Sequence, residues 1–180
     1  MFRCSYIVAA SYPDLIIGDR QTNQLLWRIP DDMRRFREIT MNGAKGCLGQ
    51  SEPSESRSAF MDGVVIMGRR TFDSLPGRKP LKGRVNIVLT RANNGISNSN
   101  SDSDGSNLHF CTMTNVFDIV ALYPGKKVFI IGGEEIYRLF WDYCERVYIT
   151  FVDFHTENDE RFARFPLGPL KLPDRQIFED

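Results

Sequence analysis

Short runs of apolar, β-branched residues recur along the chain, and stretches with helical periodicity separate them. Four such runs, at residues 6–10, 64–67, 85–90 and 128–131, have the character of buried strands, and residues 147–152 form a fifth with partial alternation. Helical patterns occupy residues 31–40, 71–75, 116–122 and 134–140. Strands that alternate with helices predict an α/β fold with a mostly parallel central sheet flanked by helices.

Two polar stretches interrupt this alternation. Residues 42–63 are rich in glycine, serine and charged residues, and residues 93–107 are nearly all Asn, Ser, Asp and Gly. We expect the second stretch to be a solvated loop, because its composition cannot bury enough apolar surface to order it. Strand patterns continue on both sides of each stretch, so we interpret both as inserts in a single domain of residues 1–180.

Composition narrows the classes of partner. The chain has 180 residues, 42% of them hydrophobic, which is enough for a sizeable core. Lys and Arg together number 23, as do Asp and Glu, so no overall charge attracts nucleic acid or an acidic membrane. No apolar run approaches the roughly 20 residues of a membrane span. We therefore expect a small-molecule partner and a cytoplasmic location.

The four cysteines do not indicate a metal site. Cys4, Cys47, Cys111 and Cys144 lack the spacing of a metal centre or a redox pair. We interpret them as free thiols in a reducing compartment, which agrees with the expected location.

One acid lies on the apolar face of the first predicted helix. Pro30 suits the first helical turn, where its missing N–H has no intrahelical partner to lose. At about 100° per residue, Asp32, Phe36 and Ile39 share one stripe of this helix, with Met33 and Thr40 at its margin.

The charged residues on the outer face of the same helix can pair with one another. Asp31 can pair with Arg35, and Arg34 with Glu38, whereas Asp32 has no partner four residues on. A carboxylate among apolar residues needs a cation or a hydrogen-bond donor, which could come from a ligand. The alternative is a capping acid with no further role.

Three predicted strands end in residues suited to a nucleotide. Gly68-Arg69-Arg70-Thr71, Thr90-Arg91 and Gly132-Gly133 each follow a strand directly. Ligands of open α/β sheets bind beyond the carboxyl ends of the strands, arginine binds phosphate oxygens, and glycine permits close approach. A tight turn or solvated loop arginines are the alternatives for each motif taken alone.

These motifs stand in the order found in dihydrofolate reductases, which the chain resembles from about residue 4 to residue 153. The matching segments are Ile7-Val8-Ala9-Ala10, Ile17-Gly18, Trp27 with Asp32, Phe36 and Thr40, residues 65–76, Pro80-Leu81, residues 84–91, Ile131-Gly132-Gly133 with Ile136-Tyr137, and Tyr148-Ile149-Thr150. The resemblance implies a single-domain dihydrofolate reductase-like fold. It also implies NADPH-dependent reduction of 7,8-dihydrofolate to tetrahydrofolate, with antifolate inhibitors as further ligands.

The resemblance implies roles for residues on the folate side. Asp32, Trp27 and Thr150 would be catalytic: Asp32 would hold pterin N3 and the 2-amino group, Thr150 would complete the polar network, and Trp27 would hold a water molecule. Arg84 would bind the glutamate α-carboxylate. The remaining substrate-binding residues would be Val8, Ala10, Met33, Phe36, Leu75, Leu81, Ile131 and Tyr137.

The resemblance also implies a cofactor-binding set. Gly68, Arg69, Arg70 and Thr71 would contact the pyrophosphate and adenosine half, and Arg91 would lie near the 2′-phosphate with Leu89 and Thr90. Ile17 and Gly18 would begin a mobile loop over the nicotinamide. The nicotinamide and phosphate side would be lined by Ala10, Ile131, Gly132, Gly133, Glu134, Glu135, Ile136 and Tyr137.

The chain departs from the family pattern in three places. Leu26 replaces the usual proline before the tryptophan, and the loop from Gly18 to Trp27 is longer than in compact members. The insert after Thr40 is also long. Family members usually continue beyond a segment like Phe162–Pro166 into a final pair of antiparallel strands, which would be missing from a chain that stops at Asp180.

The departures keep other interpretations open. One is a non-catalytic module that binds nucleotide or folate with an incomplete sheet, and another is a related NADPH-dependent pterin or pyrimidine reductase. A thymidylate synthase domain in a longer parent chain is a further expectation from the resemblance.

Overall fold

The computed structural model describes residues 2–42, 63–91, 97–99, 107–156 and 160–166. Most of the predicted insert at 42–63 lies outside these ranges. The helices are α1 (Pro30–Asn42), α2 (Arg69–Ser74), α3 (Val116–Ala121) and α4 (Glu134–Leu139), with 3₁₀ turns at Pro76–Arg78 and Trp141–Tyr143. The strands are β1 (Cys4–Ser11), β2 (Ile16–Asp19), β3 (Gly63–Gly68), β4 (Arg84–Leu89), β5 (Ser97–Ser99), β6 (Asn107–Cys111), β7 (Lys127–Ile130), β8 (Cys144–Val152) and β9 (Phe162–Arg164).

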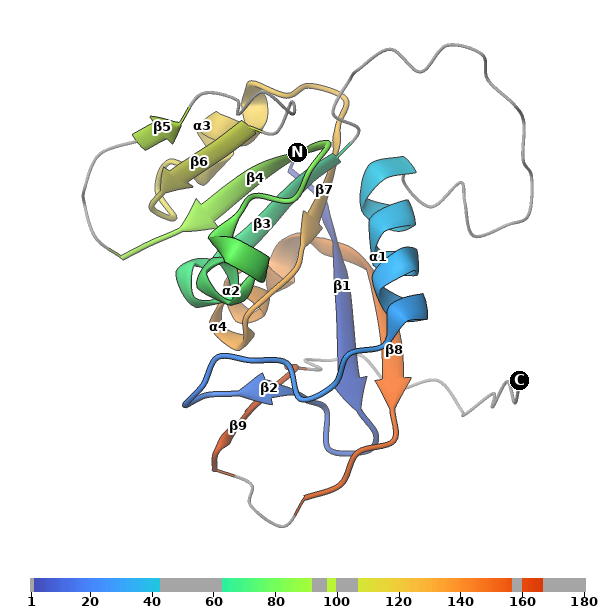
Figure 1. Ribbon diagram of the computed structural model, residues 1–180. Coiled ribbons are helices and arrows are strands. Elements are labelled where there is room, and N and C mark those ends of the chain that lie inside the picture. Colours follow the sequence, from blue (N-terminus) through green and yellow to red (C-terminus); the bar gives the residue numbers. More distant parts are fainter. Residues whose placement is uncertain (1, 43–62, 92–96, 100–106, 157–159, 167–180) are drawn as a thin grey trace.

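The central sheet has seven strands in the order β5-β6-β4-β3-β7-β1-β8 (Figure 1). Every neighbouring pair is parallel except β5 and β6, which run antiparallel. A second, two-stranded sheet pairs β2 with β9. The predicted α/β fold with a mostly parallel sheet is therefore confirmed. Among the described strands of the central sheet, β8 is the outer strand opposite β5.

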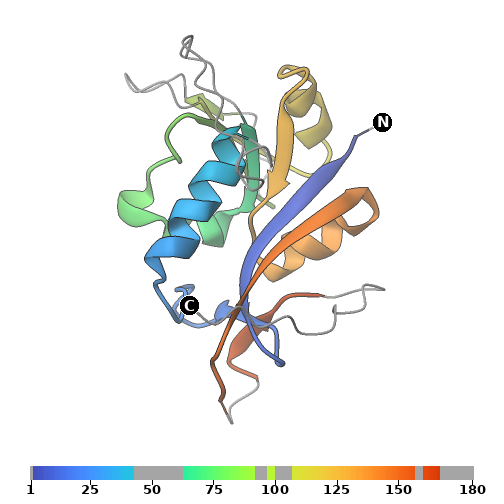
Figure 2. The same ribbon diagram turned by 90° about the vertical axis from the view of Figure 1, so that its right-hand side faces the viewer.

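Helices cover both faces of the central sheet, with α1 on one side and α3 and α4 on the other (Figure 2). Side chains alternate between these faces along each strand. In β3, Val65 and Met67 pack with Ile39 of α1 and Phe72 of α2. This burial on both faces explains why the central strands read as continuous apolar runs.

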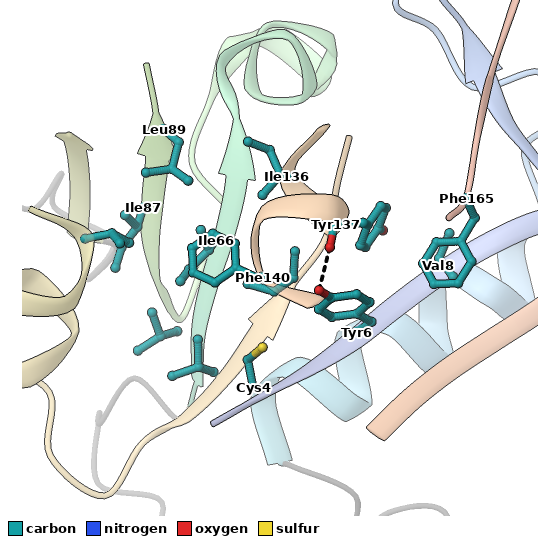
Figure 3. Packing of buried hydrophobic residues seen from close by; sticks show 14 of the residues in the cluster. Cys4, Tyr6, Val8, Ile66, Ile87, Leu89, Ile136, Tyr137, Phe140 and Phe165 are labelled. Atoms are coloured by element: carbon teal, nitrogen blue, oxygen red, sulfur yellow. Dashed lines mark hydrogen bonds between the residues drawn. The ribbon is translucent and has the colours of Figure 1, made fainter. Parts of the chain in front are cut away.

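The opposite face of the sheet carries the larger apolar cluster (Figure 3). Ile66 packs there with Ile136 and Phe140 of the α4 region. The hydroxyl of Tyr6 donates a hydrogen bond to the backbone oxygen of Tyr137 over 2.6 Å, so its polar atom is satisfied inside the cluster.

A glycine lets α1 approach the sheet closely. A Cβ atom at Gly63 would lie 2.2 Å from the backbone oxygen of Thr40. Only a residue without a side chain fits there, since the end of α1 packs directly on the start of β3. This contact fixes α1, and hence Asp32, against the sheet.

The elements missed by sequence reasoning are β2, β5, β6 and β9, which are short or carry polar residues. The expectation of a loop throughout residues 93–107 is wrong at β5, whose residues pair with β6 through backbone hydrogen bonds and need no apolar side chains. His109 lies buried within β6, and the Tyr123 hydroxyl lies 2.6 Å from its Nε2 atom. This contact lets a polar residue occupy a strand interior.

A buried acid joins the small sheet to the loop after β2. Asp19 is only 4% exposed. Its carboxylate accepts hydrogen bonds from the backbone N–H of Gln21 at 2.7 Å and from Arg161 Nε at 2.7 Å. The Arg161 hydrogen bond is the main reason that the pKa of Asp19 is lowered.

No helix in the described part of the chain is long and apolar enough to cross a membrane.

Candidate active site

Many of the predicted site residues lie on α1, on β8 or just beyond the carboxyl ends of β3, β4 and β7, whereas Arg84 lies at the start of β4. Asp32 lies half-buried on α1, and Thr150 lies on β8. The Thr150 hydroxyl donates a hydrogen bond to Asp32 Oδ1 over 2.6 Å. Within the described ranges, no donor is recorded for Oδ2, which leaves that oxygen available to a ligand.

The structure confirms the helical face on which Asp32 was predicted. Ile39 is buried and Phe36 is half-buried, whereas Asp31 is exposed. Asp31 pairs with Arg34 at 3.0 Å rather than with Arg35 as expected. Residues three apart and residues four apart are both neighbours on a helix surface. The charge of Asp31 is therefore still paired within the outer face of α1, and no ligand is needed to explain it.

An open hollow of about 530 Å³ reaches Asp32 and Thr150 from the side of β8. Most of its lining is the outer charged face of α1, including Asp31, Arg34 and Glu38. A typical small-molecule site is lined mainly by hydrophobic and aromatic side chains, so we do not equate this charged surface with a folate pocket. It does give the acid a route to water.

Trp27 shortly precedes Asp32 in the sequence, and its side chain carries an unsatisfied polar atom. Its Nε1 is buried and has no hydrogen-bond partner among the residues that the structure describes. The ring packs against Phe154 with centroids 5.7 Å apart. A buried indole N–H without an acceptor is costly, so a ligand or a water molecule that accepts its proton would be favoured there.

Arg84 is a buried cation surrounded by neutral partners. The residue is 5% exposed, and its guanidinium donates to Thr40 Oγ1 at 2.9 Å and to the backbone oxygen of Lys82 at 3.0 Å. The same group stacks over Phe36 at 5.7 Å. Burial, aided by the positive charge of Arg37, lowers the pKa of Arg84 to about 10. No described carboxylate forms an ion pair with Arg84, so an anionic ligand would compensate its charge.

The predicted apolar lining divides between two parts of the structure. Phe36, Leu75, Leu81 and Ile131 pack against the cluster on the α1 side of the sheet. Val8, Ala10 and Tyr137 belong to the cluster on the opposite side, and Met33 is 42% exposed. The structure therefore brings four of these residues to the α1 side of the sheet, where Phe36 lies against the Arg84 guanidinium.

The arginines predicted to bind phosphate are mostly occupied by acids of the chain itself. Arg69 donates to both carboxylate oxygens of Asp73, at 3.1 and 3.0 Å, and lies over the Phe110 ring. Arg91 donates to Glu135 Oε1 at 2.6 Å. Arg70 is exposed and has no ion pair with any described residue. Two of the three guanidiniums thus already hold anions.

The predicted glycines pack the end of β3 against the end of β7 and the start of α4. Gly68 N–H donates to the oxygen of Gly132 over 2.8 Å. A Cβ atom at Gly68 would lie 3.0 Å from Ile136 Cγ1, and Gly132 has a φ of +126°, which favours glycine. Thr71 lies beside Gly132 and Gly133. Gly68 and Gly132 therefore serve the close approach of these elements, and Gly132 itself is buried.

The two acids at the start of α4, Glu134 and Glu135, have different hydrogen-bond partners. Glu134 accepts hydrogen bonds from Arg20 at 2.8 Å, from Arg138 at 3.1 Å and from the backbone N–H of Arg164 at 3.3 Å. Burial opposes its ionisation, but these hydrogen bonds outweigh burial and lower the pKa of Glu134. Arg20 belongs to the loop after β2, so Glu134 links that loop to α4.

Sequence reasoning missed a polar group at the end of β6. The N–H of Thr90 donates to the oxygen of Cys111 over 2.8 Å, which places the end of β6 beside Thr90 and Arg91. The hydroxyls of Thr112 and Thr114 lie 2.6 Å apart just beyond this point. If β6 is recognised as a strand, its carboxyl end indicates Thr112 and Thr114 as further candidate site residues.

Comparisons with known proteins agree with this arrangement. Residues 54–175 match the family model described as dihydrofolate reductase. A bifunctional dihydrofolate reductase-thymidylate synthase of Daucus carota is 34% identical over 165 residues, which cover 87% of this chain and 28% of that protein. A dihydrofolate reductase of Schizosaccharomyces pombe is 38% identical over 142 residues, or 73% of this chain and 29% of its own.

A shorter relative is matched over most of its length. A dihydrofolate reductase of Bacillus subtilis is 32% identical over 170 residues, which cover 93% of this chain and 80% of that protein. By contrast, the chain spans less than a third of the length of the plant and fission yeast relatives.

Proposed function

Because the chain belongs to the dihydrofolate reductase family, we propose that it reduces 7,8-dihydrofolate to 5,6,7,8-tetrahydrofolate with NADPH. In this reaction, a hydride from the nicotinamide C4 forms the new bond at pterin C6, a proton adds to N5, and NADP⁺ is released. The product would support one-carbon metabolism and thymidylate synthesis. The observation that carries the proposal is the half-buried Asp32, held by Thr150 with one carboxylate oxygen available.

Asp32 would bind and orient the pterin. Its carboxylate would accept hydrogen bonds from N3–H and the 2-amino group, a paired geometry that an acid in an apolar setting favours. Thr150 fixes the rotation of the carboxylate through its 2.6 Å hydrogen bond. The negative charge of Asp32 would favour protonation at N5, with water as the proton carrier.

Arg84 would bind the α-carboxylate of the glutamate tail. Thr40 and the backbone of Lys82 orient the guanidinium, and Phe36 covers one of its faces. The substrate carboxylate would supply the negative charge that this buried cation lacks among the described residues. Phe36, Leu75, Leu81 and Ile131 would enclose the apolar part of the substrate between these two charges.

The residues at the carboxyl edge of the sheet fit NADPH by their chemistry. Arg69, Arg70 and Arg91 supply cations for the phosphates, Thr71 and Thr90 supply hydroxyls, and the glycines let the strand ends and α4 approach closely. The buried Trp27 Nε1, which has no partner among the described residues, would donate to the water molecule expected on the folate side. NADPH, when bound, would supply the hydride.

The cellular location and the parent chain are separate proposals. Cys4, Cys111 and Cys144 are free thiols in the described part of the chain, so we propose a reducing, cytoplasmic compartment. Because the plant relatives are named bifunctional proteins, we propose that a thymidylate synthase domain accompanies this one in a longer chain. Sequencing the full-length transcript would test the second proposal.

The direct test of activity is NADPH oxidation that depends on dihydrofolate. Steady loss of NADPH absorbance on addition of dihydrofolate would support the proposed function. Binding of both molecules without turnover would favour a non-catalytic module, and turnover of other pterins but not of dihydrofolate would favour a related reductase. Asp31→Asn provides a matched control for Asp32→Asn, because Asp31 is exposed and pairs with Arg34.

A further inference from the structure

One ion pair crosses the edge of the sheet where the cofactor would bind. Arg91 follows β4, and Glu135 lies in the first turn of α4, which follows β7. In the sheet, β3 lies between β4 and β7. The hydrogen bond of 2.6 Å between Arg91 Nη2 and Glu135 Oε1 therefore joins the two elements on either side of the carboxyl end of β3.

The pair is accessible and can be exchanged. The side chains of Arg91 and Glu135 are 86% and 61% exposed, respectively. An exposed ion pair of this kind is weakly stabilised, because water screens both charges. A phosphate group presents oxygens in the same geometry as a carboxylate and carries a larger negative charge of about −1.5 to −2 near neutral pH, so it can replace Glu135 on the guanidinium.

Glu135 differs from the other acids near the site in the partners that hold its carboxylate. Glu134 is held by two guanidiniums and a backbone N–H, and Asp73 pairs with Arg69 within the same helix. Among the described residues, Glu135 forms its ion pair with Arg91. The hydrogen bond to Glu135 is also the main reason that the pKa of Arg91 is raised.

We propose that Glu135 determines cofactor specificity by occupying the Arg91 guanidinium until the 2′-phosphate of the cofactor displaces it. The inference rests on the proposed function and goes beyond it, because it assigns an opposing role to one acid of the cofactor site. Glu135 lowers the affinity for the 2′-phosphorylated dinucleotide and leaves the affinity for the unphosphorylated one unchanged. It thereby narrows the preference for NADPH over NADH.

Equilibrium binding to the 180-residue chain tests this role without turnover. The dissociation constants of NADPH and NADH are measured by titration calorimetry for the wild type and for Glu135→Gln. We expect Glu135→Gln to tighten NADPH binding roughly two- to five-fold, the range of an exposed ion pair, and to leave NADH binding unchanged. Asp118→Asn on α3 is the charge-matched control and should change neither constant.

A double-mutant cycle separates exchange from simple repulsion. In the Arg91→Met background, Glu135→Gln should no longer tighten NADPH binding, because the guanidinium for which both anions compete is gone. The same tightening with and without Arg91 would overturn the exchange role. If the wild type binds NADPH but Glu135→Gln leaves the ratio of the two constants unchanged, only this inference fails. If the wild type binds neither dinucleotide, the proposed function fails as well.

Discussion

The proposed folate side and the proposed cofactor side of the site differ in how their charged residues are partnered. On the folate side, Arg84 is buried with neutral partners, and Asp32 is half-buried with a single hydroxyl donor. On the cofactor side, Arg69 and Arg91 are exposed and already paired with acids. Ligand charges would therefore complete the first region, whereas at Arg69 and Arg91 they would have to replace existing partners.

This difference has an energetic meaning. A buried charge without a counterion raises the free energy of the unliganded protein, and a ligand of opposite charge recovers that energy on binding. An exposed pair gives little to the unliganded protein and is exchanged at small cost. We therefore expect large effects of substitution on the folate side and small, salt-sensitive effects on the cofactor side.

The largest effect is expected for Asp32→Asn. Loss of the carboxylate removes both the pterin anchor and the charge that favours N5 protonation, so kcat/KM at neutral pH should fall roughly 10²- to 10⁴-fold. Activity should partly return at low pH, where dihydrofolate arrives already protonated. A pH series of initial rates measures this, with Asp31→Asn as the control. An Asp32→Asn rate near the wild-type value across the series would remove Asp32 from the mechanism.

Arg84→Leu should act on binding more than on chemistry. The charged hydrogen bonds to the substrate α-carboxylate are lost, so KM for dihydrofolate should rise roughly ten- to a hundred-fold with a smaller change in kcat. A dihydropterin that lacks the glutamate tail provides the internal control, since its KM should not change. An equal rise for both substrates would show that Arg84 supports the fold of the site and does not bind the tail.

The pKa of Arg84 adds a prediction on stability. Its pKa of about 10 in the folded protein lies below the ordinary value of an arginine. The unfolded chain thus binds more protons between these values, and the wild type should gain stability as the pH rises through this window. Below pH 10 the buried charge opposes folding in full. Arg84→Leu should remove this rise, as measured by urea unfolding at pH 9 and above.

The sequence predicted the parts of this comparison that depend on local periodicity. The face of α1 that carries Asp32 follows from the helical repeat alone, without knowledge of the rest of the fold. By contrast, only the family resemblance, and no local pattern, indicates a role for Arg84. Its burial depends on Gly63 and Thr40, which bring α1 onto the sheet, and no local pattern reports that packing.

Contacts between distant elements could not be predicted from local patterns. Thr150 meets Asp32 across 118 positions, and Arg91 meets Glu135 across 44. The second contact depends on the order of β4, β3 and β7 in the sheet, which periodicity does not specify. Likewise, β2 and β9 are too short to give a clear pattern, so the attachment of the loop after β2 was not foreseen.

A smaller effect distinguishes the two sides by their response to salt. Raising the ionic strength from about 0.05 M to about 0.5 M shortens the screening length severalfold, so exposed charges lose most of their long-range attraction. NADPH binding should weaken a few-fold, while binding of a folate analogue, which meets buried charges, should change less. Fluorescence titrations in sodium chloride measure both. Equal salt dependence would contradict the distinction between the two regions.

Asp19 separates the two variables of this comparison, because it is buried like Arg84 but paired like Arg91. Its pKa is lowered by Arg161, so the stability that it contributes is present above its ordinary pKa of 3.8 and is lost as the pH falls through the folded-state value. Asp19→Asn should lower Tm at pH 7, and the difference from wild type should shrink as the pH falls below about 4. Calorimetric scans over pH 2–7 measure this, with Asp14→Asn as a control from the same region. A constant difference in Tm would mean that packing, and not the charge of Asp19, holds β2 and β9 together.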